Sequence, residues 1–144
     1  MSGAPLALAA IQEAILARLR GDAPLLAIVA KRIVSRIPPG CRFPLVEVGL
    51  PVQIPWNTYG PDGRGANVTI QVKAISDLAH DGELHAIVQR VQALFDDPPT
   101  PLQVWGYQTA ACSIDTLGPP YGEPVGGGEI RHLPVIVRVI VHES

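Results

Sequence analysis

The stretch ANVTIQVKAISDLAHDGELHAIVQRVQALF, residues 66–95, decides the fold of this chain. Residues 66–76 alternate between apolar and polar side chains, which is the period of a β-strand with one buried and one exposed face. The alternation predicts that Val68, Ile70, Val72 and Ala74 face a core and that Thr69, Gln71 and Lys73 face away from it.

Residues 84–95 follow the helical period instead, with an apolar stripe along one side. Asp81 is placed to cap the N-terminus of this helix, and Glu83 in its first turn suits the helix dipole. Pro98 and Pro99 end the helix, because proline cannot continue it. A half-buried strand that runs into an amphipathic helix predicts that the helix folds back over the buried face of a sheet. The stripe consists of Leu84, Ile87, Val88, Val91, Leu94 and Phe95.

The N-terminal segment predicts two helices before the first strand. The first begins near Pro5 and ends at Arg20, where Gly21 is a natural residue to follow the last turn. Asp22 then caps a short second helix that has Pro24 in its first turn. The segment lacks the charged start of a signal peptide, so we expect a helix of the mature protein. The apolar stripe of the first helix is Leu8, Ile11, Ile15 and Leu19.

Further segments have the pattern of extended chain. Two short strands, 32–37 and 44–50, are expected to pair as antiparallel neighbours, because a short connection does not make a parallel crossover. A longer extended segment, 102–117, is broken at Gly106. The final strand, 131–143, is apolar on both faces. It therefore lies at the centre of the sheet, covered twice, or presses against another subunit.

This order of elements predicts an α+β fold, with a mostly antiparallel sheet of four to five strands and the helices packed on one face. A length of 144 residues predicts a single domain, residues 1–144. Two long loops, 51–65 and 118–130, interrupt it. The first contains prolines and glycines that exclude a regular central strand. Long loops without secondary structure are usually functional or mobile.

The composition argues against several classes of function. The net charge is −2 and no run of Lys or Arg occurs, which argues against tight contact with nucleic acid. No apolar stretch approaches the roughly 18 residues that a membrane span requires. Cys41 and Cys112 lie far apart in the sequence without metal-type spacing. We therefore expect two free thiols in a reducing compartment.

The side chains that carry chemistry do not form an active site. His80 and His85 lack the i, i+4 spacing with which two histidines hold zinc on a helix. The glycines at 126–128 precede a strand rather than a helix, so they do not form a phosphate loop. Ser113 and Asp115 have no histidine nearby and no nucleophile elbow. We expect no enzymatic activity, no cofactor and no metal site.

The first long loop offers the best candidates for contact with another molecule. It carries Trp56 and Tyr59, and aromatic residues are enriched in the cores of protein interfaces. Packing within the same subunit is an equally good interpretation of these two residues. Either way, the loop and the apolar last strand are features of a component of an assembly.

Several segments follow one another over nearly the whole chain. They are AILARLRGDAPLLAIVAKRIVSRIPPG, FPLVEVGL, the Trp56-Asn57-Thr58 loop, VTIQVKAIS with its helix ELHAIVQRVQALF, and RHLPVIVRVIV. In this order and spacing the chain resembles the small tail-terminator, or tail-completion, proteins of long-tailed bacteriophages and of phage-like gene-transfer particles. Arg131 and His132 match the Arg-His pair that opens the last strand in that family. Ala74 or Ile75 stands where many members carry a tryptophan.

The resemblance implies a structural virion protein: a ring, usually a hexamer, that caps the tail tube at full length and then docks the neck of the head. The implied partners are further copies of the chain, the tail tube protein on one side and the head–neck connector or stopper protein on the other. The resemblance further implies that DNA passes through the channel without specific binding and that no membrane is involved. The implied location is the tail or neck of the virion, after assembly in the host bacterial cytoplasm. The expected interface residues are Trp56, Tyr59, Arg64, Tyr121, Arg131 and His132.

Two other functions remain open at this point. The first is a neck stopper or adaptor of the head–tail connector, which changes the role but not the virion. The second is a small cytoplasmic ligand-binding or enzymatic domain of α+β type. That function requires a pocket with convergent polar groups, and the sequence offers no such cluster.

Overall fold

The computed structural model describes residues 4–54, 65–77, 81–126 and 128–143. Within these ranges the chain forms three helices and one sheet of seven strands. The helices are α1 (Ala4–Arg20), α2 (Ala23–Val29) and α3 (Gly82–Phe95). The strands are β1 (Ile33–Val34), β2 (Leu45–Val48), β3 (Val52–Ile54), β4 (Gly65–Ser76), β5 (Tyr107–Leu117), β6 (Tyr121–Val125) and β7 (Gly128–Glu143).

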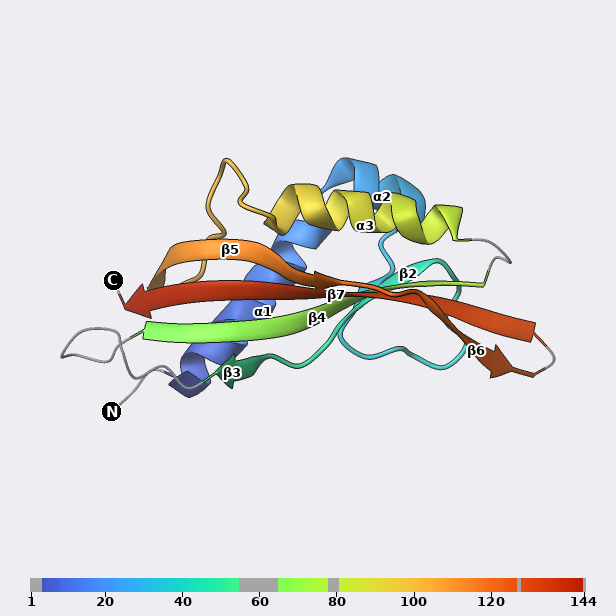
Figure 1. Ribbon diagram of the computed structural model, residues 1–144, viewed down its shortest axis with the longest axis horizontal. Helices are drawn as coiled ribbons and strands as arrows, with labels where there is room; N and C mark the ends of the chain where they lie inside the picture. Colours follow the sequence, from blue (N-terminus) through green and yellow to red (C-terminus); the bar gives the residue numbers. More distant parts are fainter. Residues whose placement is uncertain (1–3, 55–64, 78–80, 127, 144) are drawn as a thin grey trace.

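Two long central strands, β4 and β7, form the middle of the sheet (Figure 1). They pair antiparallel along all of β4, from Gly65 opposite His142 to Ser76 opposite Arg131. β2 and β3 pair with successive parts of the other edge of β4, and β1 lies outside β2. β5 and β6 divide the free edge of β7 in the same way. The sheet is therefore mostly antiparallel, as predicted.

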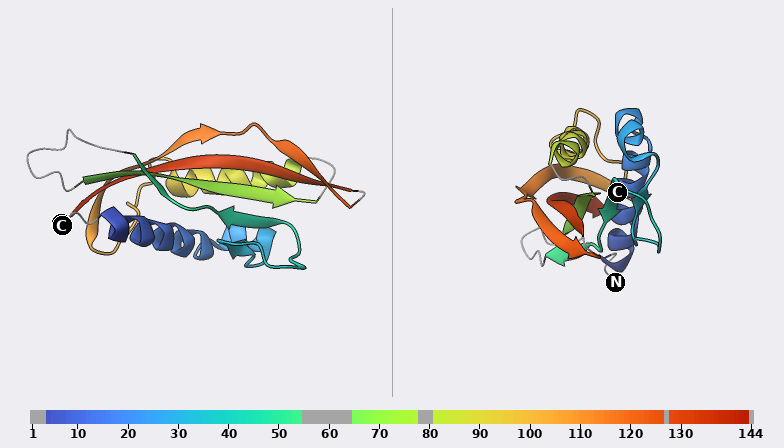
Figure 2. Two further views of the ribbon diagram at one scale, coloured as in Figure 1. Left: turned by 90° about the horizontal axis from the view of Figure 1, so that it is seen from below. Right: turned by 90° about the vertical axis from the view of Figure 1, so that its right-hand side faces the viewer.

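The helices cover one face of this sheet, and the core lies between the two layers (Figure 2). The inward-facing residues of β4 and β7 are paired in register, as for Ile70 opposite Val137. Both of these side chains are almost completely buried. Burying each such side chain stabilises the fold by about 1.5–3 kcal/mol. The predicted buried face of β4 is confirmed: Val68, Ile70, Val72 and Ala74 are buried, and Thr69, Gln71 and Lys73 lie on the face that the helices leave open.

The predicted helices are confirmed, including the cap between the first two. The Asp22 carboxylate accepts a hydrogen bond from the Leu25 N–H at 3.1 Å, which satisfies one of the free donors at the start of α2. The same carboxylate accepts two bonds from Arg90 of α3, at 2.9 and 2.8 Å. One side chain therefore fixes the α1–α2 corner against α3. All predicted stripe residues of α3 are buried except Leu94, which is half-buried.

The predicted antiparallel pairing of the first two strands is wrong. β1 and β2 are shorter than expected and run parallel, with Ile33 opposite Val46 and Val34 opposite Glu47. The connection, residues 35–44, is the reason. Extended chain covers about 3.3 Å per residue, so this connection is long enough to return to the starting end of a two-residue strand.

Both predicted long loops contain strands, so the sheet has seven strands rather than four to five. β3 lies within the 51–65 loop and pairs with β4 at an edge, where neighbouring prolines are tolerated. Most of the 118–130 loop is a β-hairpin, because β6 folds back on the first residues of β7. Gly126, with φ +50°, begins the turn between them.

The segment after α3 covers the middle of the outer edge of β5. The Ile114 N–H donates to the Asp96 carboxylate at 3.1 Å, and the Asp97 N–H donates to the Cys112 carbonyl at 2.9 Å. Gly106, at φ +84°, then turns the chain into β5, so the expected break at this residue is confirmed.

Candidate interaction surface

A hairpin extends from one end of the sheet, past the N-terminal end of α3 (Figure 1). It consists of β6 and the part of β7 that pairs with it, from Gly128 to His132. We call residues 121–126 and 128–132 the arm. All five residues of β6 are exposed. An uncovered hairpin of this kind offers both side chains and a strand edge to another molecule.

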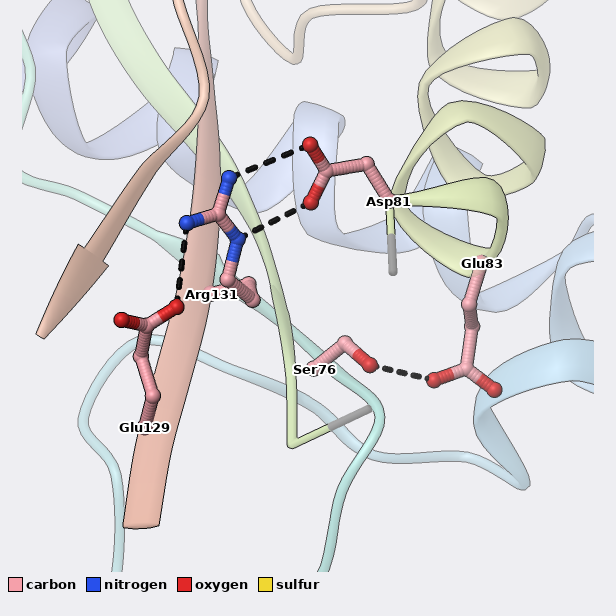
Figure 3. Close-up of polar contacts among 5 residues, drawn as sticks. All are labelled: Ser76, Asp81, Glu83, Glu129 and Arg131. Carbon is pink, nitrogen blue, oxygen red and sulfur yellow. Dashed lines mark hydrogen bonds and ion pairs between the residues drawn. The ribbon is translucent and has the colours of Figure 1, made fainter. Parts of the chain in front are cut away.

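Hydrogen-bonded ion pairs fix the base of the arm to α3 (Figure 3). Arg131 donates to both Asp81 carboxylate oxygens, from Nε at 2.9 Å and from a terminal nitrogen at 3.1 Å. Its other terminal nitrogen donates to Glu129 at 3.1 Å. Two parallel bonds to one carboxylate set a direction as well as a distance. Ser76 donates to Glu83 at 2.6 Å and ties the end of β4 to the same helical turn.

Asp81 therefore occupies the N-cap position of α3, as predicted, but its side chain makes no capping hydrogen bond. The carboxylate binds Arg131 instead. Glycine at position 122 makes room for the second partner of Arg131. A Cβ atom on Gly122 would lie 2.5 Å from the Glu129 carboxyl carbon. The Glu129 carboxylate therefore lies across the backbone of β6, on the same side of the arm as Arg131.

The opposite face of the arm carries a stack of two rings. Tyr121 and His132 are paired in register, with ring centroids 4.8 Å apart and planes 10° from parallel. Lys73 of β4 donates to the Tyr121 hydroxyl at 3.5 Å and lies 3.5 Å from a Glu47 carboxylate oxygen. His132 Nε2 lies 3.3 Å from Glu123, but without the geometry of a hydrogen bond.

His132 is only 6% exposed. Burial, followed by the nearby charge of Lys73, lowers the pKa of His132 below its usual value. The imidazole is therefore neutral at neutral pH, and its contribution to the arm is packing against Tyr121 rather than charge.

The sheet face without helices has mixed polarity. Arg138 of β7 lies 3.2 Å from Asp115 of β5, and the half-buried Ile136 and Ile140 lie on either side of it along the strand. Thr69 of β4 is paired with Arg138. The final strand was expected to be central and covered twice, or pressed against another subunit. It is central, and within the described residues only one of its faces is covered by helices.

Three large apolar side chains are much more exposed than the rest. Trp105, which precedes Gly106 and β5, is 90% exposed. Leu50 and Val52, beside and within β3, are 81% and 60% exposed. The sequence reasoning did not select these residues, because an apolar residue in a turn is compatible with burial as well as with exposure. Tryptophan is enriched among the residues that anchor protein interfaces, so Trp105 is a candidate contact residue.

The structure brings together the three predicted interface residues that it describes. Tyr121, Arg131 and His132 all belong to the arm, but Arg131 and His132 point to opposite faces because they are adjacent on a strand. Arg131 is bound within the chain, and His132 is buried. Trp56, Tyr59 and Arg64 lie outside the described residues.

Sequence reasoning missed the acidic residues beside Arg131 and His132, which are Asp81, Glu123 and Glu129. The alternation of Glu129 and Arg131 on one face was the available signal. It was overlooked because residues 118–130 were assigned to a loop.

The described residues offer little for catalysis. They contain no group of three or more side chains that would hold a metal ion. A hollow of about 90 Å³ beside Cys112 is small compared with ligand sites, which are about 300–1,000 Å³. Burial raises the pKa of the Cys112 thiol to about 11, which makes it a poor nucleophile. Both cysteines are free thiols, as expected. Over the described ranges, no helix is both long and apolar enough to cross a bilayer.

Comparison with known proteins gives one family and one fold. The family described as tail completion protein gp17 matches residues 13–115. No curated protein sequence matches the chain. A solved structure described as the virion of a native gene transfer agent (GTA) particle contains a chain with a TM-score of 0.73 and 20% sequence identity. The alignment covers 94% of this chain and 97% of that chain, so the two share a fold over almost their full lengths.

Proposed function

Because this chain belongs to the tail completion protein gp17 family, we propose that it forms a closed ring, a hexamer, that ends the phage tail tube and joins the tail to the head. The family consists of structural proteins of the phage tail and not of enzymes. The observation that carries the proposal is the family match, which runs from α1 into β5.

The architecture supports an assembly role in two ways. Among the described residues, no layer covers the polar and apolar side chains of the arm and of the open face of the sheet. Trp105 is almost fully exposed, and aromatic side chains of this kind anchor protein interfaces. In the proposed ring, the neighbouring copy, the tail tube protein and the head–neck protein cover these surfaces.

The net charge supports a channel that DNA crosses without binding. At −2, the chain lacks the strong positive charge with which proteins hold the phosphate backbone. In the proposal, the protein assembles in the host cytoplasm and remains in the tail or neck of the virion.

Deletion of the gene from the phage or gene-transfer particle that encodes it tests this role. Loss of a tail terminator is expected to give tails of uncontrolled length beside unattached heads in electron micrographs, and a plasmid copy is expected to restore uniform tails. Loss of a neck stopper or adaptor would instead leave tails of normal length beside heads that lose DNA. Normal tails and normal heads would refute both virion roles. Projection images of the purified protein or of tail ends test the sixfold symmetry.

A further inference from the structure

The arm end of the molecule carries an excess of carboxylates. The Glu123 and Glu129 side chains are 62% and 57% exposed. Arg131 bonds to both Asp81 and Glu129, so one cation is shared by two carboxylates, and Glu123 lies on the opposite face of the arm from Arg131. Two large hydrophobic residues of β6, Tyr121 and Val125, are 44% and 49% exposed. We call the exposed end of the arm and the residue that follows β4 the acidic surface. It consists of Tyr121, Glu123 and Val125 on one face of the arm, Glu129 on the other face, and Asp77.

A second surface has the opposite charge. Residues 23–46 contain no Asp or Glu and four cations. Of these, Arg32 donates to the Pro44 carbonyl, which leaves its charge uncompensated. The other three are exposed and form no ion pair with any described residue. The apolar residue Ile37, which follows Arg36 in the sequence, is 38% exposed. We call Lys31, Arg36, Ile37 and Arg42 the basic surface.

The strand order places these two surfaces at opposite edges of the sheet. β1 and the 35–44 connection form one edge, and β6 forms the other. Viewed along the sheet, the connection and the arm lie on opposite sides of the molecule (Figure 2). They are also at the same level along the strands. Ile33 is in register with Leu133 through Val46 and Ala74, and Leu133 is adjacent to the residue that pairs with Tyr121.

We propose that the acidic surface of one copy docks against the basic surface of the next copy. This inference rests on the proposed ring and names the contact that closes it. The contact is head-to-tail, since two different surfaces meet, and such contacts make rings when the rotation closes. Because both surfaces lie at one level, neighbouring copies stand side by side without a shift along the strands. A second copy fits the basic surface better than DNA does, because every copy supplies the complementary charge and the exposed apolar residues in the same molecule.

Charge reversal with the full-length protein tests the contact. The variants are Asp77→Lys with Glu123→Lys on the acidic surface and Arg36→Glu with Arg42→Glu on the basic surface. Like charges that face each other across an interface are strongly unfavourable, so each variant is expected to weaken ring formation by about tenfold or more. Combining the reversals in one chain restores opposite charges and is expected to restore rings. Glu13→Lys, at an exposed residue of α1, is the matched control and is expected to leave rings intact. Mass photometry and sedimentation velocity at low salt measure the rings, and circular dichroism checks that each variant is folded.

The contact also predicts a response to salt and a response to mixing. At 1 M salt, screening shortens the electrostatic range to about 3 Å, so the wild-type ring is expected to weaken. Mixing the two folded reversal variants is expected to give assemblies that neither forms alone. The unchanged surfaces of the two variants still have opposite charges, and so do the two changed surfaces, so copies of the two variants can alternate.

The outcomes separate this contact from the ring itself. If the wild-type protein and both reversal variants form rings equally well, the proposed contact is wrong but the ring itself is not. A wild-type protein that stays monomeric at every concentration, on its own and at tail ends, overturns both. If the basic-surface variant keeps its rings but loses binding to a labelled DNA duplex in fluorescence anisotropy, the basic surface contacts DNA and the inference is wrong.

Discussion

The exposure of Trp105 leads to a quantitative prediction for Trp105→Ala. The side chain is 90% exposed, so the substitution removes almost no packing within the chain. The free energy of unfolding is therefore expected to change by less than about 0.5 kcal/mol. A covered tryptophan buries about 150–250 Å², which at about 25 cal/mol per Å² corresponds to about 4–6 kcal/mol. Allowing for partial coverage, we expect Trp105→Ala to weaken assembly by about 2–4 kcal/mol, a factor of about 30–1,000.

Two measurements separate stability from assembly. Differential scanning calorimetry gives the melting temperature of the purified variant, and complementation of the gene deletion gives the yield of intact particles. The matched control is Leu102→Ala, three positions earlier in the same segment, where the side chain is only 3% exposed. This substitution leaves a cavity and is expected to cost about 2–4 kcal/mol. At about 2–4 °C per kcal/mol, its melting temperature falls by about 5–15 °C.

Either of two results would refute the reasoning about Trp105. If Trp105→Ala lowers the melting temperature as much as Leu102→Ala does, then the indole is packed within the fold. If Trp105→Ala changes neither melting temperature nor particle yield, no partner covers the side chain in the virion.

Three further predictions concern the fold and the arm. Asp22→Ala is expected to cost about 1–2 kcal/mol in urea unfolding, because it removes the cap of α2. Hydrogen bonds from Arg90 hold the pKa of Asp22 below its ordinary 3.8. The difference in unfolding free energy between wild type and Asp22→Ala is therefore fully present above pH 3.8 and shrinks as the pH falls further. A difference that grows in acid would contradict this prediction. Burial lowers the pKa of His132 from 6.5, so the unfolded chain binds the proton first and the melting temperature falls as the pH drops below about 6.5; His132→Phe, which keeps a ring beside Tyr121, is expected to flatten that slope. A thiol reagent at pH 8 is expected to modify Cys41, which is half-buried. Cys112, whose pKa is raised to about 11 by burial, is expected to stay unmodified until the protein unfolds. Mass spectrometry of the native protein is therefore expected to find one adduct rather than two.

The parts of the fold that the sequence predicts well are those with a long, regular pattern. The alternation in β4 and the helical stripe of α3 each extend over many residues, so their buried faces agree with the structure. Asp22 is predictable for a local reason, since a cap depends only on residues within one turn. The two bonds from Arg90 to the same carboxylate join residues far apart in the chain and have no local signal.

The features that the sequence does not predict depend on how distant segments meet. β3 and β6 are short and contain or adjoin proline, so they form strands only because β4 and β7 offer an edge to pair with. The direction of β1 relative to β2 depends on the path of the connection rather than on any residue pattern. In the candidate surface, Arg131 and His132 were selected by resemblance. Their separate roles, in an ion pair on one face and a ring stack on the other, follow only once β6 is known to be a strand.

The segment that covers the outer edge of β5 is expected to protect unassembled subunits from aggregation. An edge strand of eleven residues is a template for pairing with another chain, and such pairing leads to aggregates. Asp96 and Asp97 occupy a donor and an acceptor in the middle of that edge, and register shifts at Ala110 and Asp115 interrupt it on either side. In the proposed terminator role, the protein acts only when tail growth has stopped, so it must wait in solution without polymerising. Because the outer edge of β5 is interrupted at these backbone groups, pairing of this edge with another chain is disfavoured, and contacts there depend on side chains, which are more selective than a strand edge.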